Sequence, residues 1–204
     1  MITDVIHALF RVNLAVTPHE SVLVFTDTIR ADEVLTETDL RRRQQLPDIA
    51  QMITEAGRTF TKNIIFLQYP ACGGHGVEPP LEVWQAAFGE KTISALEENG
   101  FMMPLLTKKI SDQDISDVVA IVEEHASEAV NAVIALANFS TSHTRFRQLL
   151  TAHCATRYAS MPLFDFAMFE GPMCVDWNEL ARKTHEIAKA VSTAETVLVV
   201  TEDG

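Results

Sequence analysis

The chain has little cysteine, little positive charge and no long apolar run. Its three cysteines, Cys72, Cys154 and Cys174, fit none of the spacings of zinc ribbons or redox pairs, so reduced thiols are expected. Only 16 Lys and Arg residues stand against 28 Asp and Glu. The formal charge of -12 repels phosphate backbones and anionic lipids, which argues against nucleic acid and membrane partners.

No run of residues approaches the ~20 apolar positions needed to span a bilayer. The N-terminus also lacks a basic leader ahead of an apolar stretch. A cytoplasmic protein is therefore expected. Its 204 residues are 47% hydrophobic, which is enough for one sizeable core. With no internal repeat or flexible linker, residues 1–195 are predicted to form a single domain.

Four short apolar runs rich in branched residues predict the strands. They cover residues 22–26, 64–69, 132–137 and 197–201. Because these runs are nearly continuous, the strands should be buried on both faces, and helical patterns lie between them. The predicted fold class is therefore α/β: a three-layer, open, mostly parallel sheet with helices on both faces, Rossmann-like or flavodoxin-like.

Local signals predict the ends of several helices. Asp176 followed by Glu179 is a capping arrangement, which predicts a helix from 176 to about 192 with an apolar face packed toward the sheet. Residues 37–57 are ambiguous because Pro47 and three arginines interrupt any single apolar stripe. The run 197–201 lies at the end of the chain. Residues 196–204 are therefore expected to form a strand that leads toward an absent C-terminal metal-binding domain.

Polar loops follow the first three predicted strands, at residues 26–28, 70–78 and 140–145. Ligands of open α/β sheets gather at the carboxyl ends of strands, so these loops predict a cleft. The second loop contains three glycines, but their spacing does not match a dinucleotide or Walker fingerprint. Cys72 and His75 suggest a thiol and base, although an incidental cysteine is the simpler interpretation. His75 and Glu78 are candidate ligand-binding residues, but without a third ligand they make a poor metal signal.

The third loop leads into a predicted helix that begins at His143 and is capped by Ser142 or Thr141. His143 and Arg145 would lie in its first turn, where a cation and free N–H groups favour a carboxylate or phosphate. Ser142, His143 and Arg145 are therefore candidate ligand-binding residues. The simpler alternative is plain capping with a surface arginine.

Three blocks in fixed order resemble the N-terminal domain of the aminopeptidase T family, the thermophilic, leucyl aminopeptidase-like metallo-aminopeptidases. The blocks are Ser142-His143-Thr144-Arg145, Ser160-Met161-Pro162 and Gly171-Pro172-Met173-Cys174-Val175-Asp176. The segment His75-Gly76-x-Glu78-Pro79-Pro80 resembles the loop after the second strand in that family. The likeness covers most of the chain and is best from about residue 132 to 204.

The resemblance implies part of a hydrolase that removes N-terminal amino acids from peptides with divalent metal ions such as Zn, Co or Mn. The metal ligands of that family belong to a second domain, so no metal ligand and no catalytic residue is assigned to this chain. The resemblance implies that the N-terminal domain closes the substrate cleft and contributes to a dimer. The related superfamily also includes an iron-dependent ring-opening dioxygenase.

Three hypotheses remain open from the sequence. The first is an accessory domain of an aminopeptidase T-like exopeptidase, inactive alone. The second is a stand-alone module for small anions, and the third is an interaction subunit that pairs through the sheet edge near residues 197–201. Only the first explains a core strand at the end of the chain, so it is preferred.

Overall fold

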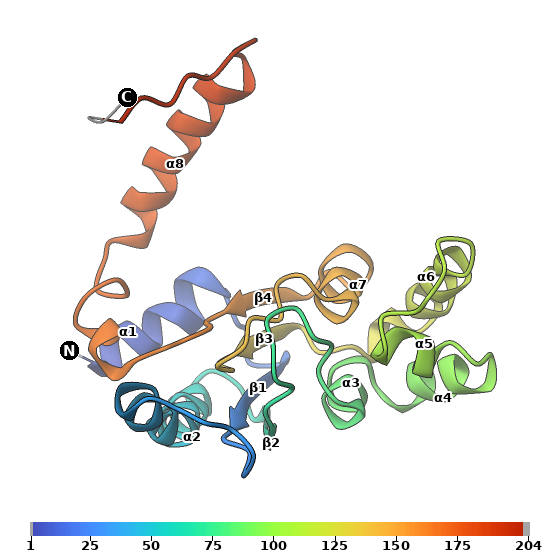
Figure 1. The fold of residues 1–204 in the computed structure, drawn as a ribbon. Coiled ribbons are helices and arrows are strands. Elements are labelled where there is room, and N and C mark those ends of the chain that lie inside the picture. The colour runs from blue at the N-terminus through green and yellow to red at the C-terminus, as the bar shows by residue number, and fades with distance from the viewer. Residues whose placement is uncertain (1, 202–204) are drawn as a thin grey trace.

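The computed structural model describes residues 2–201 and confirms the predicted α/β fold (Figure 1). An all-parallel sheet has the strand order β2-β1-β3-β4. Its strands are β1 (Ser21–Thr28), β2 (Asn63–Pro70), β3 (Ala132–Ala135) and β4 (Arg157–Ser160). This order matches the start of the flavodoxin-like order rather than the Rossmann order. The direction of strand addition reverses between β1 and β3, so a ligand crevice would lie there.

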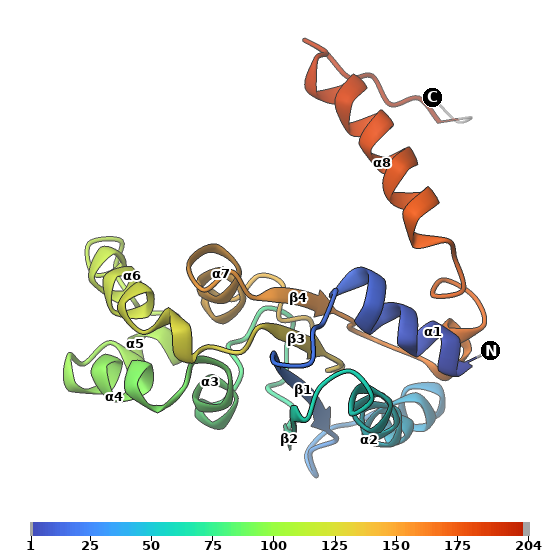
Figure 2. The same ribbon diagram turned by 180° about the vertical axis from the view of Figure 1, so that it is seen from behind.

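Helices cover both faces of the sheet, and Figure 2 shows the same layers from behind. One face carries α1 (Ile2–Ala8), the π-helix η1 (Leu9–Asn13), α2 (Glu37–Gly57) and the 3-10 helix η3 (Phe166–Phe169). The other face carries α3 (Leu81–Phe88), α4 (Glu90–Glu98), α5 (Met102–Leu106), α6 (Ile115–Glu124) and α7 (Arg145–His153). A 3-10 turn, η2 (Ala126–Glu128), precedes β3.

A hydrophobic core lies on each face of the sheet, and alternate residues of β1 pack into one core or the other. Val22 and Val24 belong to the core under α1 and α2, whereas Leu23 and Phe25 belong to the core under α3 to α7. All four side chains are fully buried. Burial of each such side chain stabilises the fold by roughly 1.5–3 kcal/mol. A continuous apolar run is thus required here, because both faces of the central strand are covered.

An aromatic cluster fixes α7 against the sheet. Phe146 lies 5.3 Å from Trp84, 5.8 Å from Phe88 and 6.1 Å from Phe25, measured between ring centroids in edge-to-face geometry. Aromatic pairs of this kind contribute about 0.5–1.5 kcal/mol each beyond their buried area. The cluster holds the N-terminus of α7 at the carboxyl edge of the sheet.

The predicted strand at residues 197–201 is wrong. These residues form no strand, and the apolar side chains from Val197 to Val200 are 56–83% exposed. The fourth strand is β4 instead, which is half-buried at every position and therefore has no continuous apolar run. A strand-like composition forms a strand only where a neighbouring strand is available for pairing. Residues 202–204 of the predicted terminal segment lie outside the described residues.

The predicted C-terminal helix exists as α8 (Trp177–Ser192). Its cap is confirmed, since the Asp176 carboxylate accepts from the N–H groups of Asn178 and Glu179, both at 3.0 Å. The predicted packing of its apolar face on the sheet is wrong. None of its residues is buried, and the helix projects away from the sheet in both views (Figures 1 and 2).

The ambiguous segment from residue 37 to 57 is one continuous helix, α2. Thr36 caps it by accepting from the N–H of Asp39 at 3.2 Å. Pro47 lies inside the helix, where it removes one backbone hydrogen bond. Burial of Leu46, Ile49 and Ile53 against the sheet offsets that loss.

Candidate functional site

The loops after β2 and β3 meet at the carboxyl edge of the sheet, as predicted. The Gly76 N–H donates to the Ser140 carbonyl at 2.7 Å, and the Ser140 N–H donates to His75 Nδ1 at 2.9 Å. Gly76 has a φ of 77°, which glycine adopts without strain and which turns the loop back toward Ser140. His75 is exposed and is held by this bond and by edge contact with Phe139.

Asp27, near the end of β1, closes the gap between β1 and β3. Its carboxylate accepts from the N–H of Asn138 at 2.8 Å and from that of Phe139 at 3.4 Å. The residue is only 1% exposed, and burial raises the pKa of its carboxyl although the amide bonds and Arg43 act in the opposite direction. The expected ligand crevice at the strand reversal is therefore occupied by protein groups.

Two arginines of α2 complete this closure. Arg43 pairs with Glu33, and this bond lowers the pKa of the Glu33 carboxyl. The guanidinium carbon of Arg43 lies 5.6 Å from the centroid of the Phe139 ring. Arg42 donates to Asn138 Oδ1 at 2.6 Å. The apolar pattern of the sequence alone predicts only that these arginines interrupt an apolar stripe. Both arginines lie in the helix that directly follows β1 in the sequence. A helix in that position begins near the carboxyl edge of the sheet, so the sequence did indicate that these arginines could reach Asp27.

Glu78, a predicted ligand-binding residue, caps α7 instead. It is 3% exposed and accepts from the N–H of Arg145 at 2.7 Å and of Phe146 at 3.1 Å. Burial raises the pKa of its carboxyl, against the effect of these two amides. The helix begins at Arg145 rather than at the predicted His143, because the Thr144 side chain accepts from the N–H of Arg147. The anion-binding capacity of this helix terminus is thus already used.

Ser142, His143 and Arg145 remain together at the surface. They line a hollow of about 420 Å³ with Lys108, Thr144, Arg147 and Gln148. Ser142 Oγ donates to Ser160 Oγ at 2.9 Å, which ties the loop to β4. Lys108 Nζ donates to the Gly76 carbonyl at 2.8 Å, and Arg145 Nη1 donates to Gln148 Oε1 at 2.6 Å. The basic groups at positions 108 and 147 were not predicted, since nothing local in the sequence places them here.

The Cys72 and His75 pair does not have the features of a nucleophile and its base. Burial raises the pKa of the Cys72 thiol to about 11, which disfavours the reactive thiolate. The Nδ1 atom of His75 is engaged by Ser140. Across residues 2–201, no group of three or more His, Cys, Asp or Glu side chains is placed to hold a metal ion. In the same range no helix is long and apolar enough to cross a membrane.

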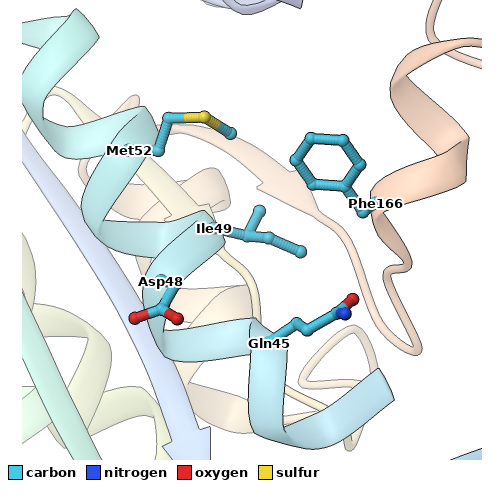
Figure 3. Close-up of a pocket in the computed structure, with 5 residues that line it drawn as sticks. All are labelled: Gln45, Asp48, Ile49, Met52 and Phe166. Carbon is cyan, nitrogen blue, oxygen red and sulfur yellow. The ribbon is translucent and has the colours of Figure 1, made fainter. Parts of the chain in front are cut away.

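Another hollow of about 420 Å³ lies between α2 and η3 and is lined by Gln45, Asp48, Ile49, Met52 and Phe166. Figure 3 shows Ile49 and Met52 projecting from α2 toward the side of the Phe166 ring. None of the predicted site residues lines this hollow.

Comparison of the chain with known protein families, curated proteins and solved structures finds no match.

Proposed function

We propose that the chain is the accessory domain of an aminopeptidase T-like, metal-dependent exopeptidase, in which the carboxyl edge of the sheet lines the substrate cleft. The ordered sequence blocks that resemble that family support this assignment. The observation that carries it is the engagement of the two carboxylates at this edge. Asp27 and Glu78 accept from four backbone N–H groups, so both carboxylates hold the backbone at this edge in place.

The exposed groups at this edge suit contact with a substrate rather than catalysis. Lys108, His143, Arg145 and Arg147 concentrate basic groups around one hollow, on a chain whose formal charge is -12. A basic rim favours the carboxylate of a short peptide. The amino end of that peptide would then extend toward a metal centre held by another domain, where a divalent ion would activate water.

Hydrolysis of leucine p-nitroanilide by the purified chain tests this proposal, with Zn²⁺, Co²⁺ or Mn²⁺ added separately. No release of p-nitroaniline above the metal-only blank is expected, because the chain supplies the wall of the cleft and not its metal site. Release that rises in proportion to chain concentration and disappears with a chelator would contradict the accessory role.

The basic hollow also favours a second candidate, a stand-alone module for small anions. A thermal-shift titration with phosphate and citrate separates the two, with Arg147→Glu as the variant that reverses one charge at the hollow. An anion module should be stabilised by micromolar ligand, and the variant should lose that response. A domain that only lines a substrate cleft should be stabilised only weakly by phosphate or citrate. The equivalent domain of the iron-dependent dioxygenase should also respond only weakly to phosphate and citrate. The aminopeptidase and the dioxygenase are instead separated by the metal ion that their catalytic domain prefers.

A further inference from the structure

Helix α8 carries a row of apolar side chains that stays partly or largely exposed, although η1 approaches the first turns of the helix. Leu180, Ile187 and Val191 are 45%, 66% and 49% exposed. Together with Trp177 and Thr184 they recur at alternating intervals of three and four residues. This spacing is that of the seam along which two helices of a coiled coil meet.

Several charged side chains of α8 pair with one another within the helix. Arg182 pairs with Glu179 at 2.7 Å and with Glu186 at 2.5 Å, and Lys183 approaches Glu179 at 3.4 Å. The one hydroxyl in the seam belongs to Thr184, and it donates to the Leu180 carbonyl at 2.8 Å. Burial of the seam would therefore leave no hydroxyl without a partner.

We infer that α8 pairs with α8 of a second copy of this chain, the two helices running antiparallel along this seam. Alanines flank the seam at Ala181 and Ala188, which lets two backbones approach closely. Antiparallel two-fold pairing places Leu180 opposite the partner's Val191 and Thr184 opposite the partner's Ile187. Each layer then matches a larger side chain with a smaller one, and the same patch serves both copies.

The charges beside the seam are compatible with this self-pairing. Lys183 is the charged residue that directly flanks the seam, and in the antiparallel register it lies near the partner's Ala190. Like charges therefore do not meet across the interface, whereas a parallel pair would bring the two copies of Lys183 to the same level. Glu179, Arg182 and Glu186 form ion pairs away from the seam, and Lys189 also lies on the outer side of the helix.

The same register covers a second exposed region. Val12, Trp177, Leu180 and Thr184 help to line a hollow of about 430 Å³ between η1 and α8. In the antiparallel pair the partner's Val191 lies beside Leu180 and therefore covers part of the open side of this hollow.

The size of the interface sets its strength. The 16 residues of α8 span roughly 24 Å at about 1.5 Å per residue. Two helices of that length bury less than the ~1,200 Å² of a standard stable interface, so a reversible dimer with a dissociation constant in the micromolar range is expected. The inference goes beyond the proposed function and is independent of the nitroanilide assay. A monomeric chain would overturn this interface and leave the role at the cleft untouched.

Sedimentation velocity over about 5 to 500 µM chain tests the interface. The wild-type chain should shift reversibly from monomer to dimer. Ile187→Glu, which puts a charge in the middle of the seam, should weaken dimerisation by at least about 100-fold. The matched control is Lys189→Glu on the outer side of the same helix, which should stay within about threefold of wild type. A wild-type chain that remains monomeric, or an Ile187→Glu chain that dimerises normally, would overturn the inference.

Disulfide trapping tests the orientation. Cys174 is exposed and is replaced by serine, whereas burial raises the pKa of Cys72 and Cys154 to about 11 and makes them slow to react. In that background a mixture of the Leu180→Cys and Val191→Cys chains should form a mixed disulfide, and neither chain should cross-link alone. Self-cross-linking of Leu180→Cys would show a parallel pair and overturn the antiparallel register. Far-UV circular dichroism confirms that each variant is folded.

Discussion

Truncation of Glu78 should destabilise the fold, because this carboxylate holds the start of α7. Glu78→Ala removes the acceptor of two N–H groups, those of Arg145 and Phe146, at 2.7 and 3.1 Å. Each buried amide left without a partner costs roughly 1–3 kcal/mol. The one lost methylene adds about 0.8 kcal/mol.

One effect of the Glu78 truncation acts in the opposite direction. Burial raises the pKa of the Glu78 carboxyl, so the folded state bears a desolvation cost that the truncation removes. The sum is a loss of about 3 kcal/mol in the free energy of unfolding. For a chain of this size that is a large fraction of the total stability, which is typically about 5–15 kcal/mol.

Urea denaturation measures this loss, with circular dichroism and tryptophan fluorescence as two probes. Trp84 is a suitable reporter because its ring contacts Phe146 in the first turn of α7. The matched control is Glu82→Ala, which removes an exposed carboxylate from the first turn of α3 and should cost at most about 1 kcal/mol. If the two variants unfold at the same urea concentration, Glu78 does not cap α7 as described.

Two further perturbations test other parts of the structure. Burial raises the pKa of the Asp27 carboxyl, so the folded chain keeps the carboxyl proton to a higher pH than the unfolded chain does. The free energy of unfolding of wild type, relative to that of Asp27→Asn, should therefore fall as pH rises from about 3.8 and become constant above the raised pKa. Urea titrations across that range check the sign, and a difference that grows with pH would contradict it. Gly89→Ala should cost about 2–4 kcal/mol, because φ is 84° and the new Cβ would lie 2.8 Å from Glu128 Cβ. Gly100→Ala, with φ of 74° and open space, should cost only about 1–2 kcal/mol, and equal losses would show that the contact with Glu128 does not matter.

The strands that could be predicted from the sequence are those with apolar runs: β1 and β3, which are covered on both faces, and the edge strand β2, which is only partly buried. Residues 22–26 lie in β1, where burial on both sides demands a continuous apolar run. The edge strand β4 needs no such run, and its four half-buried residues carry only a weak pattern. Residues 197–201 have the composition of a strand but no neighbouring strand, and composition alone does not supply one. A strand of this sheet was thus predictable where an apolar run coincides with a neighbouring strand for pairing, whether or not both of its faces are covered.

The candidate site was predictable in its place but not in its bonding. Polar loops after parallel strands must share one edge of a sheet, so His75, Ser142 and Arg145 could be grouped from the sequence. The role of Glu78 could not be inferred in the same way. Its amide partners lie 67 and 68 residues further along the chain, and only the packing of α7 brings them to it. The arginines of α2 follow Asp27 closely in the sequence, but Asn138, the partner of Arg42, lies 96 residues further along the chain.

A nuclear magnetic resonance titration of the ¹⁵N-labelled chain with the peptide Leu-Gly-Gly, in the presence of Zn²⁺, tests the proposed cleft wall most directly. We expect weak, saturable shifts at the amides of residues 73–78 and 139–147, with the peptide left intact in the same sample. Arg147→Glu should reduce these shifts, and Lys189→Glu should leave them unchanged. Release of free leucine by the chain, or the absence of any shift at this edge at millimolar peptide, would contradict a wall that contacts substrate without catalysing its cleavage.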